Sequence, residues 1–208
     1  MPEKYTILSE IIHERKSVRK FDSSYTISRE EIEEMLIEAT EAPSSSNLQP
    51  WRFMVIQDEE TRKRLKEFSY NQQQLDTASA IIAVIGDTEM YHNIDEIYQA
   101  NFEAGYMDKA NMENQISNAK ALYPKAPVEA RLNIAAFDAG LISMQLMLIA
   151  KAKGYDTVTM GGFDKQQFVK EFDLEDRYAP LVLIGVGKAA APAYGSSRLP
   201  LEKIVTFI

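Results

Sequence analysis

The chain has 208 residues, of which 45% are hydrophobic and 26% charged, with 8 prolines, 9 glycines and no cysteine. This composition is that of a globular domain, and it excludes collagen-like, low-complexity and disordered proteins. The formal net charge of −8 argues against non-specific binding to nucleic acid, which needs a basic face. Without cysteine there is no disulfide, thiolate nucleophile or cysteine-containing zinc site, and two histidines are too few for most other transition-metal sites.

The first segment is predicted to be an amphipathic helix over residues 6–14, with its apolar residues on one face. Its acidic residues and the lack of an apolar centre distinguish it from a secretory signal. Together with the missing cysteine, this favours a cytoplasmic protein. The stretch directly after this helix, residues 15–20, places four positive charges in six positions.

Helices then alternate with short apolar strands. Ser28 and Glu31 have the spacing of a capping box, which predicts the start of a helix. A loop rich in Ser, Asn and Gln at 43–50 precedes the next strand, so its polar atoms should lie at the mouth of that strand. The predicted elements are a helix from Ser28 to Ala42, a strand over 53–56, a helix over 59–68 and a strand over 80–85.

Residues 87–114 contain seven acidic residues against one lysine, interleaved with aromatic residues and methionines. This is the least regular part of the pattern. It is short and lies between core elements, so we expect an excursion of one domain rather than a separate module. The prediction is a single domain over 1–208 with a lid-like excursion at about 88–126.

A long helix is predicted from Pro127 to the Gly154 stop signal, and its centre, residues 134–150, is apolar nearly all round. A membrane span is disfavoured because Asp138, Ser143 and Gln145 interrupt the apolar stretch. Burial between two subunits explains the pattern better. We expect Asp138 to be hydrogen-bonded inside the packed core rather than catalytic.

The C-terminal part predicts a strand near 156–159, a helix opened by Asp164 and a strand over 181–185. The glycines from Gly185 onward superficially match a dinucleotide-binding fingerprint. Pro192 breaks the helix that this fingerprint needs, and too few residues remain for its βαβ unit. We therefore interpret these glycines as close packing at a strand end.

Hydrolysis is disfavoured because no G-x-S-x-G elbow exists and His13 lies on a charged helix face, as a solvated histidine would. The basic stretch Arg15–Arg19 suits a phosphate monoester, and it equally suits a solvated cap of the first helix. The amides and hydroxyls around 44–49 and 71–74 suit a neutral heterocycle with carbonyls, although loop capping explains each of them singly.

Taken in order, these segments resemble the nitroreductase family of FMN-dependent NAD(P)H oxidoreductases, and the resemblance covers essentially the whole chain. The motifs are R-x-S-x-R at Arg15–Arg19, P-S-S-x-N-x-Q-P-W at Pro43–Trp51, Asn71 ahead of Ala78-Ser79, Ala152-Lys153-Gly154-Tyr155, Gly161-Gly162-Phe163, and Arg198-Leu199-Pro200.

The resemblance implies an α+β, nitroreductase-like fold. A central mixed, mostly antiparallel sheet would be flanked by helices (α-β-α) in an intertwined homodimer. It also implies FMN-binding roles. The flavin phosphate and ribityl chain would be held by Arg15, Ser17, Arg19 and Arg198, with Lys16 contributing its backbone and Ser196 lying beside Arg198. Asn71 and Gln74 would face the ribityl and pyrimidine side, Pro43, Ser44, Ser45 and Asn47 would come from the partner subunit, and the Gly161 and Gly162 amides would approach flavin N5.

Two positions depart from some relatives, which carry lysine in place of Gln74 and near Ser196. The implied activity is hydride transfer from NAD(P)H through flavin N5 to a nitroaromatic, quinone or similar oxidant in a ping-pong cycle. Arg19 would offset negative charge near N1 and O2. Alternatives are a dehalogenase-like or flavin-consuming relative and a non-catalytic redox sensor. The sequence does not choose the oxidant or between NADH and NADPH, and it predicts neither nucleic-acid nor membrane partners.

Overall fold

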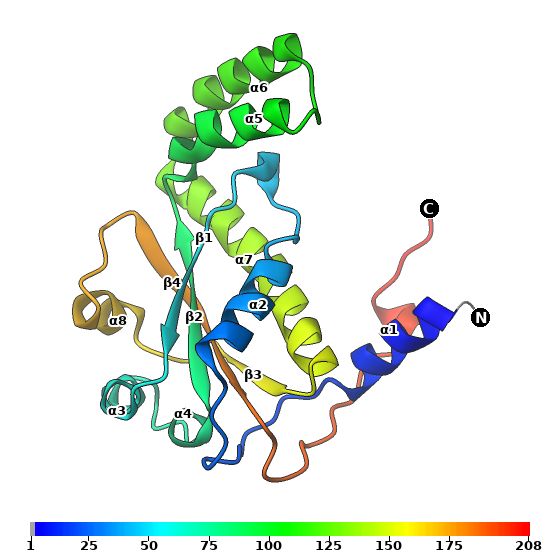
Figure 1. Ribbon diagram of the computed structural model, residues 1–208, viewed down its shortest axis with the longest axis vertical. Coiled ribbons are helices and arrows are strands. Elements are labelled where there is room, and N and C mark those ends of the chain that lie inside the picture. Colours follow the sequence, from blue (N-terminus) through cyan, green and yellow to red (C-terminus); the bar gives the residue numbers. More distant parts are fainter. Residues whose placement is uncertain (1–2) are drawn as a thin grey trace.

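A four-stranded sheet forms the centre of the computed structural model, which describes residues 3–208 (Figure 1). The strand order is β1-β2-β4-β3, and all three pairings are antiparallel. Within the described residues, the parallel component of the expected mixed sheet is confined to an isolated bridge between Ser17 and Thr157. The strands are β1 (Trp51–Ile56), β2 (Ala80–Asp87), β3 (Asp156–Met160) and β4 (Tyr178–Gly187).

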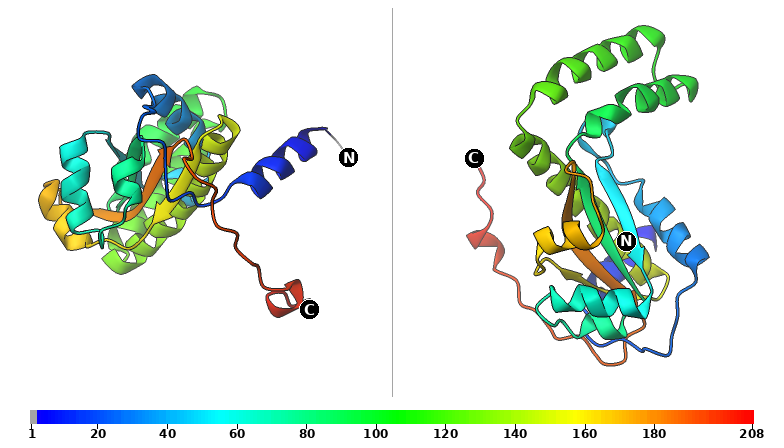
Figure 2. Two further views of the ribbon diagram at one scale, coloured as in Figure 1. Left: turned by 90° about the horizontal axis from the view of Figure 1, so that it is seen from below. Right: turned by 90° about the vertical axis from the view of Figure 1, so that its left-hand side faces the viewer.

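Helices cover both faces of this sheet, as the α+β expectation requires. Because side chains alternate along a strand, Ile82 and Val84 of β2 face one helical layer, whereas Ile81 and Ala83 face the other. α2 and α7 form the first layer, and α3, α4 and α8 form the second (Figure 2). The helices are α1 (Glu3–Glu14), α2 (Arg29–Ala39), α3 (Glu59–Glu67), α4 (Gln74–Thr77), α5 (Ile94–Glu103), α6 (Lys109–Leu122), α7 (Val128–Ala152) and α8 (Lys165–Glu171), with short 3-10 turns η1 (Ser45–Asn47), η2 (Met90–Asn93), η3 (Tyr123–Lys125) and η4 (Leu201–Lys203).

Local signals in the sequence account for the ends of several helices. The capping box at the start of α2 is confirmed, since Ser28 Oγ accepts from the Glu31 amide and the Glu31 side chain accepts from the Ser28 amide. α2 ends earlier than expected, with Thr40 as its C-cap, so that the loop to β1 is longer. Asp164 caps α8 as predicted, accepting from the Gln167 amide.

Residues 87–114, for which the sequence pattern predicts no helix or strand, are largely helical. This part of the chain folds into an antiparallel helical hairpin of α5 and α6, which stands at one end of the sheet (Figure 1). Each helix buries only a narrow stripe, such as Ile94 and Tyr98 on α5 and Met112 and Ala119 on α6. A unit of two helices has little interior, so most of each helix surface is exposed and carries polar and acidic residues. The few buried positions are therefore hard to recognise in the sequence.

α7 is long and apolar enough to span a membrane by length and composition alone. In the structure it packs against α2 and the sheet, burying residues such as Ile142 and Leu146. Its other side stays uncovered by this chain, with Phe137 65% and Met144 38% exposed. α1 and the C-terminal segment project away from the body of the protein (Figure 2), and none of the residues of α1 is buried.

Candidate functional site

The basic stretch after α1 lies along the free edge of β3. The Val18 amide donates to the Thr157 carbonyl at 3.0 Å, and this bridge fixes the stretch beside the strand. Residues 194–198 return to the same place and complete a pocket of about 460 Å³. Its lining is Arg15, Lys16, Ser17, Arg19, Tyr194, Gly195, Ser196 and Arg198.

This pocket concentrates positive charge on a chain that is acidic overall. None of the four cations that line it forms an ion pair within residues 3–208. The Arg15 Nε atom is buried and has no hydrogen-bond partner in that part of the chain, whereas Arg198 Nη1 donates to Ser196 Oγ at 2.8 Å. A buried donor without an acceptor is costly, so an anion bound here would satisfy an unmet demand.

A second group of predicted residues gathers where β3 ends. Gln72 Nε2 donates to the Gly162 carbonyl at 2.7 Å, and Gln74 Nε2 donates to Gln72 Oε1 at 2.8 Å. Asn71 precedes this pair in a left-handed conformation, with φ of 53°. No atom lies within 4 Å of the position that a Cβ would take at Gly161, so the backbone there is open to a ligand. Gln72 also belongs to this group, through its bonds to Gly162 and Gln74. The sequence does not single it out, because it is one of three adjacent glutamines.

β3 connects the basic pocket with the amide-rich group. Ser17 pairs beside Thr157, and Gly161 follows the last residue of the strand. Four residues of strand span about 13 Å at roughly 3.3 Å each. The two groups therefore lie about one strand length apart, a cationic group beside the start of β3 and a group of neutral amides and open backbone at its end.

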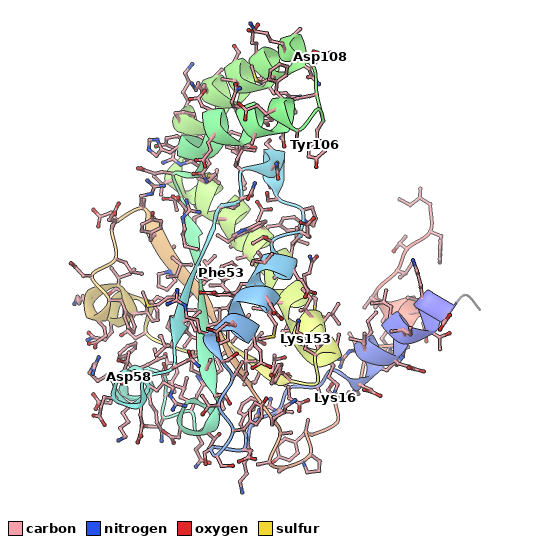
Figure 3. All side chains as sticks on the ribbon, viewed as in Figure 1. Lys16, Phe53, Asp58, Tyr106, Asp108 and Lys153 are labelled. Atoms are coloured by element: carbon pink, nitrogen blue, oxygen red, sulfur yellow. The ribbon has the colours of Figure 1, made fainter. Side chains whose placement is uncertain are left out.

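The predicted loop at Pro43–Asn47 lies elsewhere on the chain. It connects α2 to β1 beneath α5, whereas the basic stretch leads out of α1 toward the opposite end of the sheet (Figure 1). Figure 3 labels Lys16 at that opposite end, far from Tyr106 and Asp108 of the α5–α6 hairpin. A single chain thus brings two of the three predicted groups together and leaves Ser44, Ser45 and Asn47 apart from them.

Asp138 is hydrogen-bonded inside the core, as predicted. Its side chain is completely buried, and it accepts from the Ser45 amide at 2.9 Å and from Ser45 Oγ at 3.1 Å. Burial raises the pKa of Asp138 above the ordinary value, and the two bonds from Ser45 oppose this shift. The Asp138 carboxylate on α7 therefore anchors the Pro43–Asn47 loop through Ser45.

Other sequence interpretations are also resolved. His13 is exposed and its Nδ1 lies 2.7 Å from the Ser9 carbonyl oxygen, which fits a surface histidine. A Cβ at Gly187 would lie 3.0 Å from Phe21, so close packing explains this glycine. No group of three or more His, Cys, Asp or Glu residues is placed to hold a metal ion anywhere in residues 3–208.

The aromatic residues of the 88–126 segment are not equivalent. Tyr106 is 80% exposed, whereas Tyr98 is buried and donates from its hydroxyl to the Ser46 carbonyl at 3.0 Å. Tyr91 and Phe102 are half-buried in the hydrophobic cluster of the hairpin. Of these four residues, only Tyr106 presents most of its ring to a molecule outside the chain.

Comparison with known proteins gives consistent matches over the chain. The family model described as "Nitroreductase family" matches residues 12–188. The Bacillus subtilis (strain 168) protein "Putative NAD(P)H nitroreductase YdgI" is 44% identical over 197 residues, covering 94% of each chain. "Oxygen-insensitive NADPH nitroreductase" of Helicobacter pylori is 30% identical, covering 96% of this chain and 95% of that one. A solved structure from Exiguobacterium sibiricum 255-15, a "putative nitroreductase in complex with FMN", is 41% identical with a TM-score of 0.92 and 97% of both chains covered.

Proposed function

Because this chain belongs to the nitroreductase family, we propose that it is an NAD(P)H-dependent oxidoreductase that uses FMN to reduce nitroaromatic, quinone or similar oxidants by a ping-pong mechanism. The basic pocket beside β3 is the observation that carries this proposal. The FMN-bound relative, with a TM-score of 0.92, supports the choice of cofactor. When bound, FMN supplies the hydride chemistry at its N5 atom, and the protein supplies binding and orientation.

The pocket fits the phosphate end of FMN. Arginine forks donate in pairs to phosphate oxygens, and Arg15 has a buried Nε that needs an acceptor. Ser17 adds a hydroxyl, and Arg198 adds a charge from the C-terminal segment. Because Arg19 lines this same pocket, we assign it to the phosphate end rather than to N1 and O2 of the ring.

The open backbone after β3 fits the ring end. The Gly161 amide would approach the ring at a position with no atom within 4 Å, and the Gly162 amide would follow beside the Tyr70 ring, 3.5 Å from where a Cβ would lie. Asn71 and Gln74 would offer amides to its polar edge, and Gln72 holds the Gly162 carbonyl in place. These residues orient the ring, and none of them has to transfer a proton for hydride transfer to proceed.

We propose an intertwined homodimer in which each FMN site is built from both chains. Phe137 and Met144 on α7 leave an apolar surface exposed, and Ile204 and Phe207 do so on the C-terminal segment. β1 is an edge strand, so its outer backbone groups have no partner in the sheet. A second copy could cover these surfaces and bring its Ser44, Ser45 and Asn47 to the pocket that this chain leaves incomplete.

The α5–α6 hairpin would cover the substrate side of the flavin and set the choice of oxidant. It is continuous with the Pro43–Asn47 loop through the buried cluster of Leu48, Met90 and Tyr98. Elements that stand on a rigid scaffold commonly carry such selectivity.

The test is to purify the protein, record its visible spectrum and titrate it anaerobically with NADH and then NADPH. We expect a yellow protein with stoichiometric FMN, reduction by at least one nicotinamide, and repeated turnover with a quinone and a nitroaromatic. Parallel lines in double-reciprocal plots would support the ping-pong order. Reduction without turnover would instead favour a redox sensor, turnover of only one narrow oxidant class would favour a specialised family member, and failure to bind FMN would contradict the proposal.

A further inference from the structure

The loop that we assign to the FMN site has an unfavourable backbone conformation. Ser46, Asn47 and Gln49 have φ angles of 51°, 55° and 48°, in the left-handed region that residues other than glycine rarely occupy. Such a conformation costs free energy and persists only where surrounding contacts hold it. The function of the loop therefore depends on the contacts that hold it in this conformation.

Asp138 of α7 supplies the first of these contacts. Its buried carboxylate accepts from both the amide and the hydroxyl of Ser45, at 2.9 and 3.1 Å. It is the only acidic residue between Glu129 and the end of α7 at Ala152. Burial of a carboxylate in an apolar helix costs free energy of solvation. Here both of its oxygens accept hydrogen bonds from a single loop residue, Ser45.

Two tyrosines of the α5–α6 hairpin region supply the others. Tyr98 of α5 donates its hydroxyl to the Ser46 carbonyl at 3.0 Å, and the Tyr123 hydroxyl of η3 lies 2.7 Å from Ser46 Oγ. Both tyrosines are buried, with 6% and 7% of their surfaces exposed. Three elements distant in sequence thus converge on two adjacent residues of the loop.

We propose that Asp138, Tyr98 and Tyr123 are positioning residues for FMN, because they hold the Ser44–Asn47 loop in the shape in which it contacts the cofactor. This rests on the proposed function, in which that loop reaches the FMN bound to the partner subunit. In this arrangement the three side chains act on the cofactor through the loop that they hold. The same contacts tie the α5–α6 hairpin to the loop, so the hairpin and the loop meet the partner's flavin as one unit.

Isosteric variants test the tyrosines. In the purified dimer, Tyr98→Phe and Tyr123→Phe each remove one hydroxyl, and Ser46→Ala removes the partner of Tyr123 from the exposed side of the loop. Loss of one neutral hydrogen bond should speed FMN dissociation about 2- to 10-fold. Tyr91→Phe is the matched control, because this half-buried tyrosine of the same cluster has no hydrogen bond to the loop.

Asp138 is tested by a pair of substitutions. Asp138→Ala removes both acceptors and should speed FMN dissociation about 10- to 100-fold, as loss of a charge-assisted bond does. Asp138→Asn should fall between wild type and Asp138→Ala, because the amide oxygen can accept from the Ser45 amide while the Ser45 hydroxyl rotates to accept from the amide nitrogen, but both bonds are then neutral. Ser143→Ala is the control on the same helix, since the buried Ser143 hydroxyl has no partner in residues 3–208.

The readouts are FMN dissociation by fluorescence, the visible spectrum and midpoint potential of the FMN that stays bound, and thermal unfolding of the apoprotein. A purely structural role would lower the unfolding temperature while leaving the spectrum and potential unchanged. The proposal is overturned if the tyrosine variants and Asp138→Ala release FMN no faster than their controls. A wild type that binds no FMN at all would refute the proposed function itself, which is a distinguishable result.

Discussion

Replacement of Arg15 and Arg198 by alanine should weaken FMN binding to different extents. Both arginines line the basic pocket, but Arg15 is half-buried and its Nε has no partner among residues 3–208, whereas Arg198 is exposed and already donates to Ser196. A charge-assisted hydrogen bond from a partly desolvated donor contributes about 1.5–3 kcal/mol. Exposed charge pairs contribute about 0.2–1 kcal/mol because water and salt screen them.

These magnitudes set the expected affinities. Arg15→Ala should raise the FMN dissociation constant about 10- to 100-fold, and Arg198→Ala should raise it about 5-fold or less. The effect of Arg198→Ala should also shrink further in about 1 M salt, where the screening length is near 3 Å. Arg15→Lys should fall between wild type and Arg15→Ala, because lysine keeps the charge but loses the planar fork.

The measurement is fluorescence titration of apoprotein with FMN at low and high salt. Lys20→Ala is the control, since Lys20 belongs to the same basic stretch but does not line the pocket. If Lys20→Ala weakens binding as much as Arg15→Ala, net charge rather than the pocket governs affinity. If neither arginine variant differs from wild type, the assignment of the phosphate to this pocket is wrong.

Three further changes probe the assembly, the hairpin and a buried contact. Phe137→Glu places a charge on the exposed apolar side of α7, so sedimentation should show loss of the dimer and of FMN with helical content retained; a monomer that keeps stoichiometric FMN would contradict the shared site. Tyr106→Ala should change the ratio of kcat/KM values among several oxidants without changing FMN affinity, and equal ratios would indicate a merely solvated side chain. Tyr155→Phe removes a hydroxyl that donates to Glu31 at 2.5 Å and lowers the pKa of Glu31, so it should reduce the free energy of unfolding by about 1–3 kcal/mol at pH 7. Because the contribution of the Glu31 charge is lost as pH falls through the lowered pKa, the difference in urea unfolding between this variant and wild type should narrow in acid, leaving the part due to the Tyr25 hydroxyl 3.1 Å away, and a gap that is constant with pH would refute the assignment to Glu31.

Much of the fold could be predicted because local signals and hydrophobic period agree. β2 is apolar from Ala80 to Gly86 and is buried along its length, and the capping box of Ser28 marks where α2 starts. The α5–α6 hairpin is not evident from the sequence, because its buried stripes are narrow and its acidic faces dominate the composition. Burial of a narrow stripe depends on the partner helix, which local sequence does not specify.

For the candidate site, residue types and order along the chain sufficed to select the basic stretch, the amides and the paired glycines. The pairing of Ser17 with Thr157 and the return of residues 194–198 to Arg15 depend on contacts between segments far apart in sequence. The same is true of Asp138, whose chemistry was evident in an apolar helix but whose partner, Ser45, lies 93 positions away. Periodicity and capping act within a few residues and so can be read along the chain, whereas the partner of a buried polar group is set by packing of the whole core.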